Sequence, residues 1–281
     1  MARETPYREA ELPAMAKTTV DGLLQHVDPD ALVAYILQQK EARSGVRASV
    51  ASAVRPAEGV DRFEAQHVKA LAALTSFGIE TKGAPSWEQI KAVITPEQLR
   101  SIEHMSQPTL VLTPPMTRQE MVGAINKQKG KYGIRNDTYT YNLDDDAFYN
   151  DGKQEGKPTW EVSIVEGVTD VNVNEALQMK GGKFRRNHEQ VSALLKDLKE
   201  KGLEALSGAR CYLAAMISAL AGGQPIDVQN WTVLNANTVD QNPTSLLGVG
   251  SWVSDQVNLD YGHPNYGNCD LRLRAAVRVN L

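Results

Sequence analysis

The C-terminal end of the chain, from residue 208 onward, constrains the fold most. Residues 208–217 are small and apolar and predict a helix, which ends at the glycine pair 222–223. Two strand-like runs follow, at 250–261 and 270–279, with a segment rich in Asn, Gly and Tyr between them. We therefore expect a terminal pair of strands on a helical scaffold, and the polar residues between them to form a surface.

Composition places the chain among ordinary globular proteins. Its 281 residues suffice for one or two domains, and 42% hydrophobic with 23% charged residues is a usual balance. The net charge of -4 gives no general basic field, so we do not predict nucleic acid as a partner. The N-terminus lacks the apolar core of a signal peptide, and no later run is apolar enough to span a bilayer. We expect a cytoplasmic or particle-associated protein without a membrane span.

The two cysteines are too few for a disulfide-built scaffold and lack the Cys-x-x-Cys spacing of metal sites. Cys211 falls in the apolar helix, so we expect a small buried hydrophobic side chain there. A bridge between Cys211 and Cys269 is the alternative.

The first 107 residues predict a helical N-terminal region. Apolar residues recur at helical spacing within 20–37 and 63–77. Ser86 and Thr95 each precede a glutamine by three residues, which is the capping-box pattern at the start of a helix.

The character of the chain changes at Pro108, and we expect a second domain over 108–281. A short run rich in strand formers, 109–113, is followed by a proline pair and a helix start at Thr117. Further along, the patterns predict strands at 139–143 and 160–164 and helices at 188–201 and 208–221. The fold class is thus α+β, with a small antiparallel sheet at the C-terminal end.

No metal or cofactor site is predicted. The three carboxylates at 144–146 suggest calcium, but the glycine and the closing glutamate of an EF-hand loop are missing, which favours an exposed acidic loop. His26, His67 and His104 have no ligand spacing and are expected as surface or capping residues. The glycines at 248 and 250 lack the third glycine and the helix of a dinucleotide fingerprint.

The order strand, helix, helix, Trp-bearing segment, irregular loops and terminal strands resembles the C-type lectin-like fold. The residues that carry this resemblance are 211–215, Pro225 to Asp227, Trp231 and the ending 271–279. The same fold is used by formylglycine-generating enzymes, and a similar ending follows the variable residues in variable proteins of diversity-generating retroelements and in uncharacterised bacterial and phage proteins.

The resemblance implies a binding module whose last strands and loops present side chains for contact. On a single strand over 250–261, Val253, Val257, Leu259 and Tyr261 share the buried face, and the other face carries the polar residues. Trp252 falls with the polar residues, although its size also suits the core. The candidate ligand-binding residues are Trp252, Ser254, Gln256, Asn258, Asp260, Tyr261, His263, Asn265, Tyr266 and Asn268.

We therefore expect non-catalytic recognition of a protein or surface ligand, with the helical region as a tether to a partner or to another copy in a homo-oligomer. The first alternative is a structural or assembly protein of a phage or particle, with the same surface as a subunit interface. A weaker alternative is an enzyme in which His263 and a neighbouring carboxylate, Asp260 or Asp270, form an acid–base pair. A hydrolase is not favoured, because the chain from 248 to 252 lacks a nucleophile turn.

Overall fold

The chain divides into two compact units, Met1–Gly59 and Val60–Leu281. The computed structural model describes residues 61–141, 158–167, 186–228, 230–242, 244–263, 265 and 271–281, all of them in the second unit. The predicted helices before residue 60, the acidic run 144–146 and the candidate residues Tyr266 and Asn268 lie outside the described residues.

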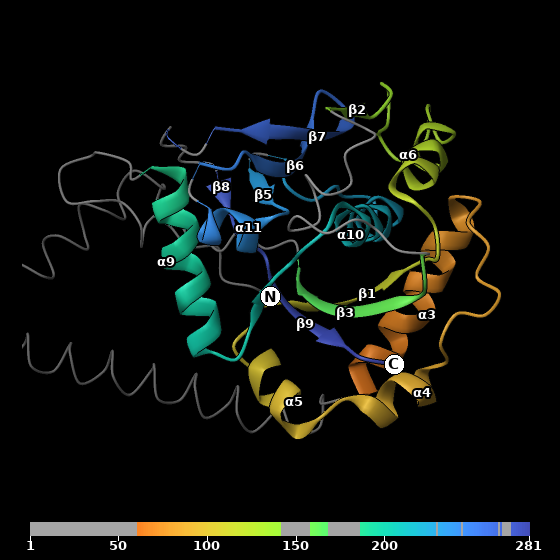
Figure 1. Cartoon of the computed structure of the whole chain (residues 1–281). Coiled ribbons are helices and arrows are strands. Elements are labelled where there is room, and N and C mark those ends of the chain that lie inside the picture. Colours follow the sequence, from red (N-terminus) through yellow and green to blue (C-terminus); the bar gives the residue numbers. More distant parts are fainter. Residues whose placement is uncertain are drawn as a thin grey trace, which may run out of the picture. The chain divides into compact units, whose positions relative to one another are not determined.

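The second unit is built from helices and two sheets (Figure 1). In sheet A, every pairing is antiparallel and the strand order is β1-β3-β9-β4. Its strands are β1 (Pro108–Thr113), β3 (Glu161–Glu166), β4 (Glu204–Ala205) and β9 (Ala275–Val279). The predicted strands near 109–113 and 160–164 are therefore confirmed, and the central residues of β3 are buried on both faces of the sheet.

Sheet B has the order β2-β7-β6-β5-β8. Its strands are β2 (Tyr139–Thr140), β5 (Trp231–Val233), β6 (Leu247–Val253), β7 (Gln256–Gly262) and β8 (Leu271–Arg272). The inner pairs are antiparallel, whereas β2 with β7 and β5 with β8 are parallel. Sheet B is therefore mixed, and the predicted antiparallel arrangement holds throughout only in sheet A.

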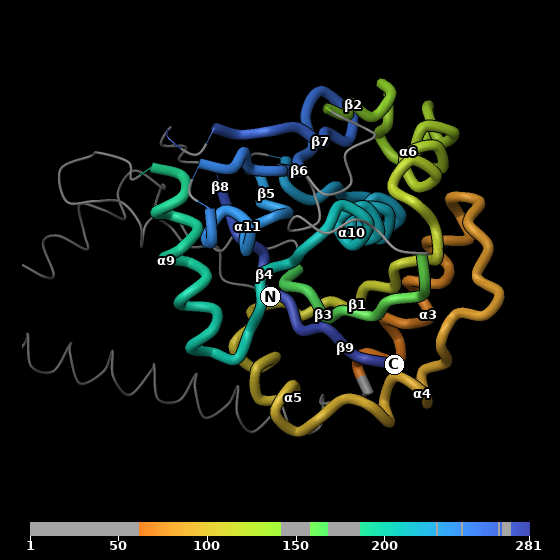
Figure 2. Tube along the Cα trace, in the orientation of Figure 1, coloured from red at the N-terminus to blue at the C-terminus, as the bar shows by residue number. Residues whose placement is uncertain are grey.

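The two C-terminal runs do not pair with each other, which corrects the predicted terminal strand pair. Figure 2 follows the chain from β7 in sheet B through β8 to β9 in sheet A. The last strand pairs with β3, where Val277 and Val279 lie opposite Ile164 and Val162. All four side chains are buried, so this pairing adds the apolar residues of β9 to the core beside β3.

Helix α10 (Ala209–Ala221) is the predicted apolar helix, and it lies between the two sheets (Figure 1). Most of its residues are buried on all sides, which is expected of a helix without a polar face. Its buried residues belong to one hydrophobic cluster with Leu110 and Ile164 of sheet A and Val257 and Leu259 of sheet B. Cys211 is buried as expected, and its thiol is free.

The other helices surround this core. They are α3 (Asp61–Ser76), α4 (Trp87–Val93), α5 (Pro96–Ile102), α6 (Arg118–Asn126), α9 (Asn187–Glu200) and α11 (Ala236–Gln241). Both predicted capping boxes are present, with Ser86 and Thr95 accepting from Gln89 and Gln98. His104 is exposed as expected, whereas His67, also expected at the surface, is buried, and its Nε2 lies 2.8 Å from the carbonyl oxygen of Pro85, which satisfies its polar atom.

Helices α3, α4 and α5, which precede residue 107, belong to the same compact unit as the sheets. The physical reason is the contact of α3 with β1 and α10. The amide side chain of Gln66 donates to the carbonyl of Pro108 at 3.2 Å and accepts from the N–H of Leu110 at 2.7 Å. Gln66 thereby satisfies two backbone groups on the outer edge of β1, where no further strand from the described ranges pairs.

Across the described ranges, none of the helices is both long and apolar enough to cross a bilayer.

Candidate functional site

The predicted strand 250–261 is a hairpin, because the chain reverses at Ser254 and Asp255. Both residues have positive φ, 52° and 59°. This is the pattern of a two-residue type I′ turn, whose twist matches that of the flanking strands. Val253 pairs with Gln256 across the turn, and Trp252 pairs with Val257.

The turn changes which side chains share a face. Trp252 lies on the same face as Val257 and Leu259 and is only 6% exposed. Val253, predicted to be buried, is 39% exposed. The predicted alternation of faces is therefore wrong for these two residues, since it continued one strand through the turn.

The remaining candidate residues separate by exposure. Ser254, Tyr261, His263 and Asn265 are exposed, and Gln256 and Asp260 are half-buried. Asn258 is 8% exposed and pairs with the fully buried Ser251 of β6. Trp252 and Asn258 thus lie inside the protein, whereas the other six described candidates are accessible at least in part.

Three tyrosines gather at the β2 side of sheet B. Tyr139, Tyr141 and Tyr261 are 46%, 37% and 45% exposed, and we call them the tyrosine edge. The parallel pairing of β2 with β7 places Tyr139 opposite Asn258, and the rings of Tyr141 and Tyr261 lie 4.5 Å apart at 44°. Sequence reasoning found Tyr261 but missed the other two. The alternation at 139–141 did predict a strand, but it did not indicate that this strand would pair with β7.

The loop before β2 fixes the hairpin tip. The carbonyl of Asp255 accepts from the N–H of Arg135 at 2.9 Å, and the carbonyl of Ser254 accepts from the side-chain amide of Asn136 at 2.8 Å. The guanidinium of Arg135 also lies 3.4 Å from the carboxylate of Asp255, but both groups are exposed and this pair contributes little. The tip and the tyrosine edge are consequently joined through one short loop.

A buried ion pair holds sheet B to the last strand. The carboxylate of Asp227 accepts from Arg274 and, at 2.7 Å, from the hydroxyl of Thr232. Its backbone carbonyl accepts from the N–H of Trp252 at 3.1 Å. Arg274 also donates to the carbonyl of Glu166 at 2.9 Å, at the end of β3. Asp227 therefore links the hairpin and both sheets, although its φ of 59° is unusual for a residue other than glycine.

His263 and Asp260 each accept a hydrogen bond from a backbone N–H group. The Nδ1 atom of His263 accepts from the N–H of Asn265 at 3.1 Å, and the carboxylate of Asp260 accepts from the N–H of Tyr261 at 2.8 Å. Asp270, the other carboxylate considered for an acid–base pair, lies outside the described residues. Within the part of the chain that the structure describes, no group of three or more His, Cys, Asp or Glu residues is placed to hold a metal ion.

Comparison with known proteins gives no match to this chain among family models, curated proteins or solved structures. The hairpin and the tyrosine edge are therefore the features that bear on function.

Proposed function

We propose that the protein recognises a protein or surface ligand, without catalysis, through the tyrosine edge and the β6–β7 hairpin tip. The observation that carries the proposal is the exposure of Tyr139, Tyr141 and Tyr261 at the β2 end of sheet B, where the rings of Tyr141 and Tyr261 are in contact. Tyrosine side chains are enriched in binding surfaces because they offer a large amphipathic area and lose little conformational entropy on binding.

The hydrogen bonds that hold the neighbouring hairpin turn in place also favour recognition. Ser254 and Asp255 stand at the tip of a turn held by Arg135 and Asn136. Contact residues on loops that are anchored to a rigid scaffold lose less freedom on association, which leaves more of the contact energy for affinity.

The finer proposal is a C-type lectin-like domain over residues 108–281. The order of β3, α9, α10, the Trp-bearing β5 and the closing strand β9 supports it. If the domain is a variable protein of a diversity-generating retroelement, variation among sibling sequences should fall on exposed positions such as Ser254 and Tyr261. The buried Trp252 and Asn258 should stay constant, and uniform variation across 252–270 would count against this proposal.

Peptide selection tests the proposed surface. Peptides are selected from a random phage-displayed library on the full chain, and their affinities are measured by biolayer interferometry. The triple variant Tyr139→Ser/Tyr141→Ser/Tyr261→Ser should lose about tenfold or more in affinity, since aromatic residues dominate such contacts. The control Val68→Ser changes a 62% exposed side chain on α3 and should bind as the natural chain does.

A library that yields no binder, or only peptides insensitive to the triple substitution, would refute the proposed surface. Light scattering of the same variants measures their mass in solution and distinguishes ligand recognition from the alternative of an assembly protein. If the surface joins copies of the chain, the triple variant should shift the mass toward the monomer.

A further inference from the structure

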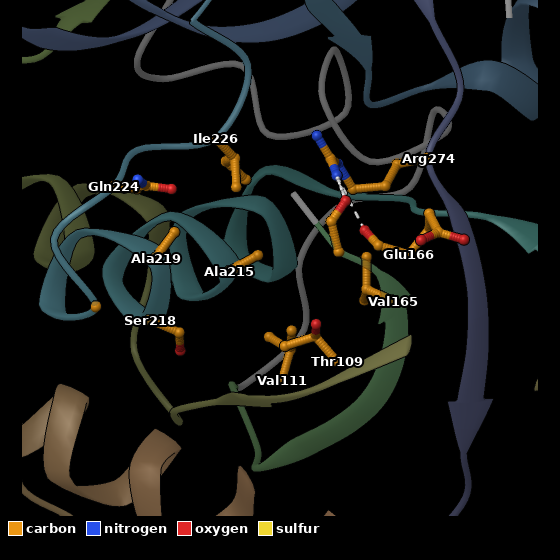
Figure 3. A pocket seen from close by; sticks show the side chains of 12 residues that line it. Thr109, Val111, Val165, Glu166, Ala215, Ser218, Ala219, Gln224, Ile226 and Arg274 are labelled. Carbon is orange, nitrogen blue, oxygen red and sulfur yellow. Dashed lines mark hydrogen bonds between the residues drawn. The ribbon is translucent and has the colours of Figure 1, made fainter. Parts of the chain in front are cut away.

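A pocket lies between α10 and one face of sheet A (Figure 3), and no residue of the tyrosine edge lines it. Its volume is about 280 Å³, near the lower limit for small-molecule sites. Its walls come from β1, β3, the C-terminal half of α10 and the segment that follows this helix.

The walls are mostly apolar. Val111, Val165 and Ile226 line the pocket and are only 1%, 2% and 3% exposed, so they form its deep part. Ala215 and Ala219 face them from α10 (Figure 3). Protein interiors rarely leave voids of this size next to well-packed side chains, and here the short alanine side chains leave the space open.

The two charged groups in the wall, Arg274 and Glu166, are both engaged, although Nε of Arg274 has no hydrogen-bond partner among the described residues. Arg274 donates to the carboxylate of Asp227 and to the carbonyl of Glu166. The carboxylate of Glu166 accepts from the N–H groups of Ser106 and Gln107, both at 2.7 Å. A charged ligand would lose its hydration here without meeting a counter-charge that is not already engaged, which is unfavourable.

We infer that this pocket binds a small, uncharged, apolar molecule. An apolar cavity of roughly 150 Å³ accommodates benzene, so the present volume suits about ten to twelve carbon atoms, the size of a fused two-ring aromatic or a short branched hydrocarbon. This site is independent of the proposed recognition surface, because the two share no residue.

The test uses 2-naphthol as the probe, with binding followed by calorimetry and by thermal shift of the full chain. We expect saturable 1:1 binding to the natural protein. Ala215→Leu and Ala219→Leu fill the pocket and should each weaken binding about tenfold or more, whereas Ala72→Leu, on an exposed position of α3, should leave it unchanged. The triple tyrosine variant should also bind normally, which separates this inference from the proposed function.

The charged analogue 2-naphthoate should bind about tenfold or more weakly than 2-naphthol, because the pocket offers no uncompensated cation. Should a filled variant fail to fold, nuclear Overhauser contacts from 2-naphthol to the methyl groups of Val111 and Val165 locate the probe in the natural protein. The inference is overturned if the natural protein does not bind 2-naphthol, if folded variants with a filled pocket bind it equally well, or if 2-naphthoate binds more tightly.

Discussion

The substitution Gly250→Ala tests how α10 and sheet B fit together. A Cβ atom at Gly250 would lie 2.6 Å from Cζ of Tyr212, with Cδ1 of the same ring at 2.8 Å. Tyr212 is wholly buried on a helix enclosed by the core, so its ring has no space into which to retreat. The added methyl group must therefore displace the strand or the helix.

The expected loss of stability is about 2 kcal/mol. Overpacking a core typically costs about 1–3 kcal/mol, and a ring without free space on its far side places this case toward the upper end. Replacing glycine returns roughly 0.4–1 kcal/mol, because the unfolded chain becomes less flexible. In a unit of this size, 2 kcal/mol corresponds to a fall in Tm of about 4–8 °C. Urea unfolding followed by tryptophan fluorescence measures the change as a lower midpoint with an unchanged slope.

Gly123→Ala is the matched control. Gly123 lies inside α6, and a Cβ there would meet nothing within 4 Å, so the change should stabilise the protein by about 0.5–1 kcal/mol. Adding Tyr212→Leu to Gly250→Ala removes the obstructing ring, and the two changes should then couple by about 1 kcal/mol or more. Full stability of Gly250→Ala, or simple additivity in the double variant, would show that the ring does not oppose the strand.

Three further substitutions test the scaffold by the same unfolding assay. Gln66→Ala leaves the N–H of Leu110 without its partner at the edge of β1 and should cost about 1–3 kcal/mol, and unchanged stability would mean that water replaces this bond. Asp227→Asn removes the charge that compensates the largely buried Arg274 and should cost about 3–5 kcal/mol; a loss below 1 kcal/mol would show that this ion pair does not stabilise the fold. Burial, followed by the nearby charge of Asp227, raises the pKa of Tyr212 well above its usual value. The unfolded state therefore releases this proton first, so stability should fall as pH rises above about 10, and Tyr212→Phe should remove that part of the fall; an identical alkaline slope in the variant would assign it to other groups.

Local signals in the sequence predicted the helices well. The capping boxes at Ser86 and Thr95 satisfy the free N–H groups of a helix start with side chains only three residues away. The apolar helix at 208–221 could be predicted without knowing which elements pack against it, since a helix that lacks a polar face is expected to be buried. Such features depend on neighbours in the chain, which the sequence displays directly.

The pairing of strands depends on distant residues and was predicted less well. β2 pairs with β7 across more than a hundred residues, so the tyrosine edge has no local signature. The assignment of β9 to sheet A likewise follows from its contact with β3. Parallel pairs in particular join segments that are far apart in the chain, and an apolar run alone does not identify its partner.

The hairpin tip explains why the predicted face of the sheet was wrong, and it bears on function. A type I′ turn favours Asn-Gly or Gly-Gly, and the sequence at 254–255 contains no glycine. Left-handed backbone costs about 1–2 kcal/mol per residue outside glycine, and here the bonds from Arg135 and Asn136 to the turn carbonyls offset that cost. Glycine would suit the backbone better but would present no side chain. A turn that keeps Ser254 and Asp255 at its accessible tip despite this cost is easier to understand as part of a contact surface than as a connection alone.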